Sequence, residues 1–345
     1  MTSRELVKKT LKFDNPDRVP RHLWHLPWAK FNYPKELEEI QKRFPDDITS
    51  PPNCYNKISE DIYNFYEPEG TSHQPGEATD EWGCTFLNFN KGTIGEVKNP
   101  PVKDWSQINN IKIPYDYLSI DVDKVNSFCK STDKFVLAGL NGGNMPRPFE
   151  KLQFIRGSEN LYIDLAEKPK ELFDFLEKLH DFYKQMFEMW AKTDIDGLVF
   201  MDDWGSQNSL LISPKTWIEI FKPLYKDYVE IAHKYNKFVF MHSDGYILDI
   251  YPHLIEIGVD AINSQIFCMG VKNLEKYKGK ISFWGEIDRQ RLLPYGSLQD
   301  IENAVVSIKN SLYYNGGVFA QCEFGPGAKP ENVYKVFETW EKIMR

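Results

Sequence analysis

The stretch FVFMHSDG, residues 238–245, is a short apolar run that ends in a polar cluster. The same pattern occurs five more times along the chain, and amphipathic segments separate most of the runs. Alternation of strand-like and helix-like segments predicts parallel strands joined by crossover helices. Besides His242-Ser243-Asp244-Gly245, the polar clusters are Asn141-Gly142-Gly143, Asp202-Asp203-Trp204-Gly205, Asn263-Ser264-Gln265, Gly285-Glu286-Ile287-Asp288 and Gln321-Cys322-Glu323.

These clusters favour a barrel, with an open doubly wound sheet as the alternative. In a barrel of parallel strands all the clusters converge on the carboxyl-terminal face, where barrel enzymes have their active sites. The GxGxxG motif typical of a dinucleotide-binding open sheet does not follow any of the runs. Helix capping explains a single Asp after a strand, but so many polar clusters in succession indicate a functional site.

The amino-terminal part of the chain is less regular. Residues 3–11 predict a helix capped by Thr2 or Ser3, and residues 19–28 predict an extended segment rich in aromatic residues. Residues 82–97 predict a hairpin that turns around Asn90-Lys91-Gly92. We expect a single domain over residues 1–345, with elaborations and the first barrel elements up to residue 130 and regular β/α repeats over 131–345.

Composition and charge limit the classes of function. The chain has 345 residues, a net charge of −8 and scattered basic residues, which argues against a nucleic-acid-binding surface. Its 5 cysteines are irregularly spaced and form no CxxC pair, which indicates reduced thiols. No apolar run approaches the roughly 18 residues of a membrane helix, and the amino terminus lacks a signal-peptide pattern. We therefore expect a cytoplasmic protein that binds neither nucleic acid nor membrane.

His242 and Asp244 are the first candidates for a metal site. Side chains at positions i and i+2 of a strand project to the same side, so both can reach one point. Cys322, which ends a later run, would add a thiolate, and this ligand set suits zinc with an open fourth position. Glu286 and Glu323 are alternative oxygen ligands or proton-transfer groups. A lone HxD pattern and a buried cysteine are each also explained without a metal.

We call the carboxyl-terminal face of the predicted barrel its mouth. Other residues at the mouth are candidates for catalysis or substrate binding. Asp203 is a candidate acid or base, with helix capping as the alternative explanation. Trp24 and His25 could line a ligand pocket, and Arg147 could meet an anionic group or point to solvent. The full set of substrate-binding candidates is Trp24, His25, Asn141, Arg147, Asp202, Gln207 and Gln265.

The chain resembles the uroporphyrinogen decarboxylase superfamily along nearly its whole length. This resemblance implies a (β/α)8 TIM barrel with a catalytic cleft at its carboxyl-terminal face. We expect the N-terminal extension and the β-hairpin to elaborate this barrel. The residues that carry the resemblance are Arg18-Val19-Pro20, Asp80-Glu81-Trp82-Gly83, Asp202-Asp203-Trp204-Gly205-Ser206-Gln207, Leu211-Ile212-Ser213-Pro214, Met241-His242-Ser243-Asp244-Gly245, residues 254–260, Phe283-Trp284-Gly285-Glu286-Ile287-Asp288 and Pro330-Glu331-Asn332-Val333.

The superfamily has two main branches, and the resemblance implies different residues for each. Decarboxylases hold the carboxylates of their substrate with an arginine-rich motif, whereas residues 21–28 here contain one arginine and several aromatic residues. Cobalamin-dependent methyltransferases bind zinc through His-x-Cys and a later Cys. His242 and Cys322 match two of those positions, and Asp244 stands where the middle cysteine would be. An aspartate makes a harder site, which argues against a thiol substrate.

The leading hypothesis is a corrinoid-dependent methyltransferase. It would move a methyl group between a small methylated substrate of methoxy, methylamine or thiol type and methylcobalamin or cob(I)alamin on a corrinoid protein, with zinc at the site. The alternative is a metal-free decarboxylase, in which Asp46 or Asp47 would face the substrate. A third hypothesis is a protein that binds a small molecule without turnover. Self-association into a homo-oligomer is left open.

Overall fold

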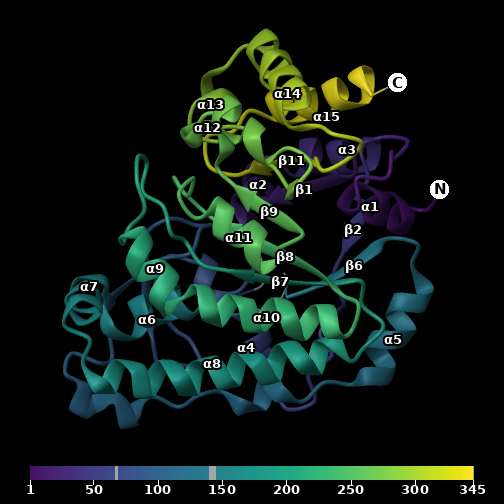
Figure 1. Cartoon of the computed structure of the whole chain (residues 1–345). Coiled ribbons are helices and arrows are strands. Elements are labelled where there is room, and N and C mark those ends of the chain that lie inside the picture. Colours follow the sequence, from purple (N-terminus) through teal and green to yellow (C-terminus); the bar gives the residue numbers. More distant parts are fainter. Residues whose placement is uncertain (67–68, 140–144, 345) are drawn as a thin grey trace.

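The computed structural model describes residues 1–66, 69–139 and 145–344, and it belongs to the α/β class (Figure 1). A six-stranded parallel sheet has the strand order β10-β9-β8-β7-β6-β2, and β1 pairs with β11 in a second parallel ladder. These strands are β1 (Arg21–His25), β2 (Ile48–Thr49), β6 (Phe135–Ala138), β7 (Gly197–Met201), β8 (Phe238–Ser243), β9 (Ala261–Ser264), β10 (Ser282–Phe283) and β11 (Ala320–Phe324). The predicted runs from residue 135 onward are therefore strands.

Two links join the outer strands of the larger sheet to the β1–β11 ladder. A parallel bridge pairs Phe283 of β10 with Val318, which lies just before β11. At the other end, the backbone N–H of Asp47 donates a hydrogen bond of 2.8 Å to the carbonyl of Arg21. The mostly parallel sheet is therefore curled, as in folds of the TIM-barrel type.

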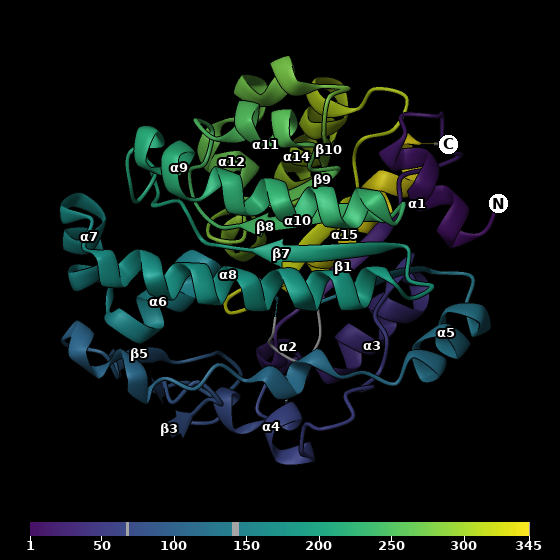
Figure 2. The ribbon, with the colours of Figure 1, turned by 60° about the horizontal axis from the view of Figure 1, so that its bottom comes forward.

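Helices connect the strands and cover the outside of the sheet. Figures 1 and 2 both show the long helices α8 and α10 side by side, and their residues are in contact. None of the described helices is long and apolar enough to span a membrane. The helices are α1 (Ser3–Leu11), α2 (Pro27–Asn32), α3 (Pro34–Arg43), α4 (Glu60–Asn64), α5 (Val122–Ser131), α6 (Pro148–Arg156), α7 (Ser158–Glu167), α8 (Lys170–Ala191), α9 (Pro214–Ile220), α10 (Lys222–Lys234), α11 (Tyr251–Ile257), α12 (Ile266–Met269), α13 (Leu292–Tyr295), α14 (Leu298–Leu312) and α15 (Pro330–Ile343), with 3-10 turns at Thr71–His73, Trp105–Asn110, Tyr115–Leu118 and Val271–Tyr277.

The amino-terminal region contains several elements that the sequence pattern did not predict, namely α2, α3, α4, α5, β2 and β3. Helix α1 begins with a capping box between Thr2 and Glu5, in agreement with the predicted helix. Strands β4 (Thr85–Asn88) and β5 (Glu96–Asn99) pair antiparallel, and β3 (Gly76–Thr79) adds a third strand on the other side of β4. Because β3 is mostly exposed, it lacks the apolar alternation that marks a half-buried strand.

Side chains alternate between two apolar clusters along the parallel strands. Phe240 on β8 contacts Trp284 at the end of β10 and Phe319 before β11, with ring centroids 4.9 and 6.0 Å apart. These rings come from strands that are not neighbours in the sheet, so they fill the space that the curled sheet encloses. Val239 and Met241 belong instead to the larger cluster between sheet and helices. We call these two sides the inner and the outer face.

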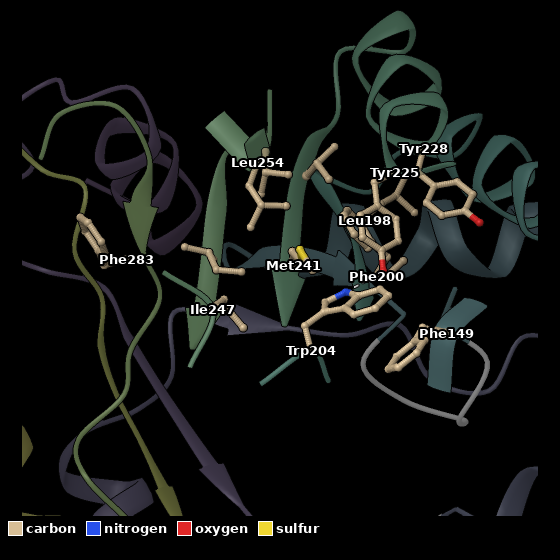
Figure 3. Packing of buried hydrophobic residues seen from close by; sticks show 14 of the residues in the cluster. Phe149, Leu198, Phe200, Trp204, Tyr225, Tyr228, Met241, Ile247, Leu254 and Phe283 are labelled. Atoms are coloured by element: carbon tan, nitrogen blue, oxygen red, sulfur yellow. Dashed lines mark hydrogen bonds between the residues drawn. The ribbon is translucent and has the colours of Figure 1, made fainter. Parts of the chain in front are cut away.

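Asp202 lies on the outer face and ties β7 to two helices. Its carboxylate accepts hydrogen bonds from the backbone N–H groups of Phe149 and Glu150, at 3.1 and 2.7 Å, which caps the start of α6. It also accepts a bond of 2.5 Å from the Tyr225 hydroxyl. Tyr225 in turn accepts from the indole of Trp204, which stacks on Phe149 (Figure 3). Asp202 is fully buried, so its predicted role in substrate binding is replaced by a structural one.

Asp202→Ala should lower the free energy of unfolding by about 3 kcal/mol, because three buried donors lose their acceptor. Asp202→Asn, which keeps an acceptor oxygen of the same size, should lose less. Urea unfolding followed by circular dichroism measures both changes. An alanine variant as stable as the wild type would show that the cap contributes nothing.

Asp46 predicts a pH dependence of stability. Its carboxylate accepts a hydrogen bond of 2.7 Å from the backbone N–H of Leu23, and burial raises its pKa from 3.8 to about 7. Between these two values the folded protein keeps a proton that the unfolded chain has lost. The free energy of unfolding therefore decreases as the pH rises through this window.

Asp46→Asn removes the ionisable group and keeps the acceptor for Leu23. We expect its melting temperature to exceed that of the wild type at pH 8 by about 2 °C, and to match the wild type at pH 4. Asp17→Asn, at an exposed position, serves as the matched control. A difference from the wild type that is equal at both pH values would contradict the assignment.

Candidate functional site

His242 ends β8 on the inner face, and a chain of hydrogen bonds orients its ring. The side-chain amide of Asn263 donates a bond of 2.5 Å to the backbone carbonyl of Trp284, which turns its oxygen toward His242. That oxygen lies 2.7 Å from His242 Nδ1, so Nδ1 carries a proton and donates it. In the neutral ring, Nε2 then presents its lone pair, as in histidines that bind metals.

Two carboxylates face this nitrogen. His242 Nε2 lies 3.5 Å from Asp203 Oδ1 and 3.7 Å from Asp244 Oδ1. The backbone N–H of Asp244 donates to Asp203 Oδ1 at 2.9 Å, which holds the two aspartates together. One ligand atom from each residue lies within 4.8 Å of the other two. We call Asp203, His242 and Asp244 the mouth triad.

The mouth triad fits a divalent cation. Asp244 Oδ1 is buried and has no hydrogen-bond partner among the described residues. Burial, together with the neighbouring charge of Asp244, raises the pKa of Asp203 to about 6. A cation bound between these groups would satisfy the unpaired oxygen and relieve the repulsion between the carboxylates. One imidazole nitrogen and two carboxylates form a ligand set that zinc accepts.

Arg289 joins the mouth triad to two glutamates. Its guanidinium bonds Asp244 Oδ2 and Glu323 Oε2, the latter at 3.0 Å, and it lies 3.8 Å from Glu286. Burial raises the pKa of Glu286 well above its usual value, although Arg289 opposes the rise. Burial also raises the pKa of Glu323. The sequence pattern does not place Arg289 at the site, and its one signal there is its position three residues after Glu286.

Cys322 does not join the mouth triad, which corrects the predicted ligand set. It is buried in the outer cluster, together with Leu23 and Phe324. Side chains alternate along a strand, so its neighbours Gln321 and Glu323 take the inner face instead. Burial raises the pKa of the Cys322 thiol well above its ordinary value, which opposes the thiolate form that a metal requires.

The other predicted residues divide into those near the mouth triad and those away from it. The ring of Trp24 lies with its centroid 5.2 Å from that of His242. Gln207 and Gln265 line a pocket of about 360 Å³ with Glu286 and Arg289. Arg147 is not in this group, because its guanidinium pairs with Glu150 at 3.1 Å near the start of α6.

His25 forms no hydrogen bond with the mouth triad among the described residues. His25 Nδ1 is buried without a hydrogen-bond partner among the described residues, and burial lowers the pKa of the ring. Asn141 lies outside the described residues.

Adjoining hollows extend the site along the mouth. A second pocket, of about 340 Å³, is lined by Glu323, Tyr295 and the loop over 325–328. Arg289 and Gln290 border both this pocket and the first. Arg289 thus lies in the wall between two cavities and beside the mouth triad. The arrangement can hold a cation, bind a small polar molecule and place carboxyl groups next to it.

Comparisons with solved structures show a shared fold. A methyltransferase from Methanosarcina mazei matches with a TM-score of 0.69 and 13% identity, covering 100% of both chains. An endo-β-1,4-xylanase from Gloeophyllum trabeum has a TM-score of 0.44 and 10% identity, covering 96% of this chain and 98% of its own. A TM-score of 0.44 is too low to bear on fold or function.

Comparison with curated protein sequences yields no match. The family model described as uroporphyrinogen decarboxylase (URO-D), however, matches residues 2–343. Since this match includes nearly every residue, the chain belongs to the uroporphyrinogen decarboxylase family.

Proposed function

We propose that this protein is a corrinoid-dependent methyltransferase that moves a methyl group between a small methylated substrate and a cobalamin-carrying partner protein. The observation that carries the proposal is the mouth triad, in which an oriented imidazole faces two carboxylates. The fold shared with a protein described as a methyltransferase supports it. We further propose that residues 1–345 form one cytoplasmic domain, a (β/α)8 barrel closed at the two links beside β1 and β11.

In this proposal Asp203, His242 and Asp244 hold zinc. Bound zinc would act as a Lewis acid that polarises the heteroatom bearing the methyl group. Asn263 keeps the His242 Nε2 lone pair available by accepting the proton of Nδ1. Arg289 holds Asp244 through its Oδ2 atom, which leaves Oδ1 directed toward His242.

The two glutamates supply binding and proton transfer. Glu286 is 3% exposed, and burial raises its pKa, so its carboxyl group retains a proton that it can give to a leaving heteroatom. Glu323 stays hydrogen-bonded to Arg289 and faces the second pocket. The half-buried Trp24 beside His242 provides an apolar wall that limits access of water.

Metal-free decarboxylation has weaker support. A substrate with several carboxylates needs free cationic groups at the mouth, but Arg289 is already engaged with three carboxyl groups. Asp46 and Asp47 immediately precede β2, at the amino ends of the strands. Asp47 accepts two hydrogen bonds from Arg18, at 2.6 and 2.7 Å. Both aspartates therefore lie at the amino ends of the strands, away from the mouth.

Elemental analysis tests the ligand set. We expect about one zinc per chain in the wild type and a loss of zinc in His242→Ala and Asp244→Ala. Cys322→Ala should keep its metal, because that side chain lies on the outer face. Loss of zinc in Cys322→Ala with retention in Asp244→Ala would contradict the mouth triad. A wild type that stays metal-free after incubation with zinc would exclude the metal-assisted mechanism.

Methyl transfer itself can be followed by the absorbance change of free cob(I)alamin mixed with candidate donors. His242→Ala should lower kcat/KM by at least about 100-fold, because the metal and its orientation are lost together. Glu256→Gln, an exposed position on α11, should leave the rate unchanged. Turnover of uroporphyrinogen without corrinoid would favour the decarboxylase, and binding of donors without turnover would favour a binding protein.

A further inference from the structure

The first pocket, the cavity of about 360 Å³ beside Glu286 and Arg289, is rich in carboxamide side chains. A carboxamide offers N–H donors and a carbonyl acceptor. The hydrogen bonds that these residues form with other described residues involve their backbone atoms only. The pocket therefore presents hydrogen-bonding groups that the fold does not use, and hydroxyl groups, which both donate and accept, suit them. The carboxamides are those of Gln207, Asn208, Gln265 and Gln290.

The charges around this pocket favour a ligand without net charge. Zinc in the mouth triad would offset the carboxylates of its two aspartates, and Arg289 is hydrogen-bonded to Glu323. On the pocket wall itself, Asp288 and Arg291 add one charge of each sign. A cation or an anion bound here would disturb this balance, whereas a neutral molecule preserves it.

Glu286 places a proton donor in the wall of the same pocket. It is 3% exposed, and burial raises its pKa well above its usual value, so its carboxyl group stays protonated and can donate a hydrogen bond. A ligand atom accepts this bond only through a lone pair. An ether oxygen has lone pairs, a thioether sulfur accepts weakly, and an amine nitrogen that is protonated or fully methylated has none. Glu286 therefore distinguishes the three donor types by the atom that bears the methyl group.

We propose that the substrate is a methyl ether of a polyhydroxy compound, with its ether oxygen at Glu286 and its hydroxyl groups at the carboxamides of the first pocket. This inference rests on the proposed methyltransferase function and selects the methoxy type among the three donor types. The ether oxygen keeps a further lone pair, on which zinc in the mouth triad would act. A neutral substrate, a proton donor and a metal are thus compatible at one site.

The groups at the site account for the proton and the electron pairs of the transfer. The bond between the ether oxygen and the methyl carbon breaks, and its electron pair stays on the oxygen, which takes the proton of Glu286. The methyl carbon bonds to the nucleophilic cob(I)alamin of the partner protein, whose cobalt is formally oxidised from cobalt(I) to cobalt(III). The products are a neutral alcohol and a carboxylate at Glu286. The guanidinium of Arg289, 3.8 Å away, stabilises this carboxylate.

Four compounds that share a diol and differ in one group test the proposal. 3-Methoxy-1,2-propanediol carries the ether, 3-(methylthio)-1,2-propanediol a thioether and (2,3-dihydroxypropyl)trimethylammonium a cation, and 1,2-pentanediol has a methylene group in place of the ether oxygen. Isothermal titration calorimetry on the zinc-loaded full chain should show the methoxy compound binding about tenfold more tightly than the other three, because its oxygen is the best acceptor for Glu286. Equal binding of the methoxy compound and 1,2-pentanediol, tighter binding of the thioether or the cation, or no binding of the methoxy compound at millimolar concentration overturns the proposal.

Substitutions of Glu286 separate hydrogen bonding from proton transfer. Glu286→Gln keeps a donor of the same shape, so it should retain the preference for the methoxy compound over 1,2-pentanediol, while methyl transfer to free cob(I)alamin slows by at least about 100-fold. Glu286→Met removes the donor and should abolish the preference. The matched control Glu256→Gln, exposed on α11, should change neither property. A preference that survives in Glu286→Met, or one that appears only in Glu286→Gln because the wild-type group is ionised, overturns the role of Glu286.

Gln207→Met and Gln265→Met test the hydroxyl contacts. Each should weaken binding of the methoxy compound and of 1,2-pentanediol by the same factor, about threefold, because both compounds carry the same diol. Gln207 is exposed and Gln265 half-buried, so the variants should fold, and their melting temperatures check this. The control Gln299→Met, exposed on α14, should leave both affinities unchanged. Unchanged affinities in both pocket variants overturn the placement of the hydroxyl groups.

The outcomes separate this inference from the proposed function. A protein that transfers methyl groups to cob(I)alamin from the thioether or the cation, but not from the methoxy compound, is a methyltransferase for another donor and overturns this inference alone. A protein that prefers the methoxy compound through Glu286 but never transfers its methyl group contradicts the proposed function and leaves the recognition of the ether in place.

Discussion

Side chains alternate between the two faces of the parallel strands, and this constraint determines which side chains lie at the mouth. Val199 on β7, Phe240 on β8 and Phe319 before β11 belong to the inner cluster. Counting onward in steps of two from each of these residues leads to Asp203, to His242 and Asp244, and to Gln321 and Glu323. The rings that fill the interior and the polar groups that form the mouth are thus successive members of the same inner rows.

Alternation brings the groups together, and electrostatics decides what they can bind. Burial raises the pKa of Asp203 and Glu286, and the charges of neighbouring carboxylates add to the rise. Arg289 relieves the repulsion for Asp244 and Glu323, with which it forms hydrogen bonds. The unpaired Oδ1 of Asp244 is left facing His242. A divalent metal bound between Asp203 and Asp244 would offset the repulsion between their carboxylates.

The α/β class of the fold and the strand ends that gather the candidate residues could be predicted from the sequence, but the exact set of side chains at the candidate site could not. The runs from residue 135 onward show the apolar pattern of buried strands, and the polar clusters after them predicted where the site lies. Which face each residue takes depends on the register, and a shift of one residue exchanges the faces. Cys322 and Glu323 are adjacent, and no local signal distinguishes inner from outer there. Arg289 follows the strand in a loop, so its position depends on tertiary contacts alone.

Because of this alternation, Asp202 has a structural role and Asp203 belongs to the candidate site. The two residues are chemically identical and adjacent, so neither composition nor a sequence motif distinguishes them. The alternation of side chains along β7 continues past its end, so that Asp202 lies on the outer face, where it caps α6 and binds Tyr225. Asp203, the next residue, lies on the inner face, next to His242. A carboxylate at the end of a barrel strand is therefore a candidate for chemistry only when it lies an even number of residues from a side chain on the inner face of that strand. This criterion requires one inner residue of each strand to be known.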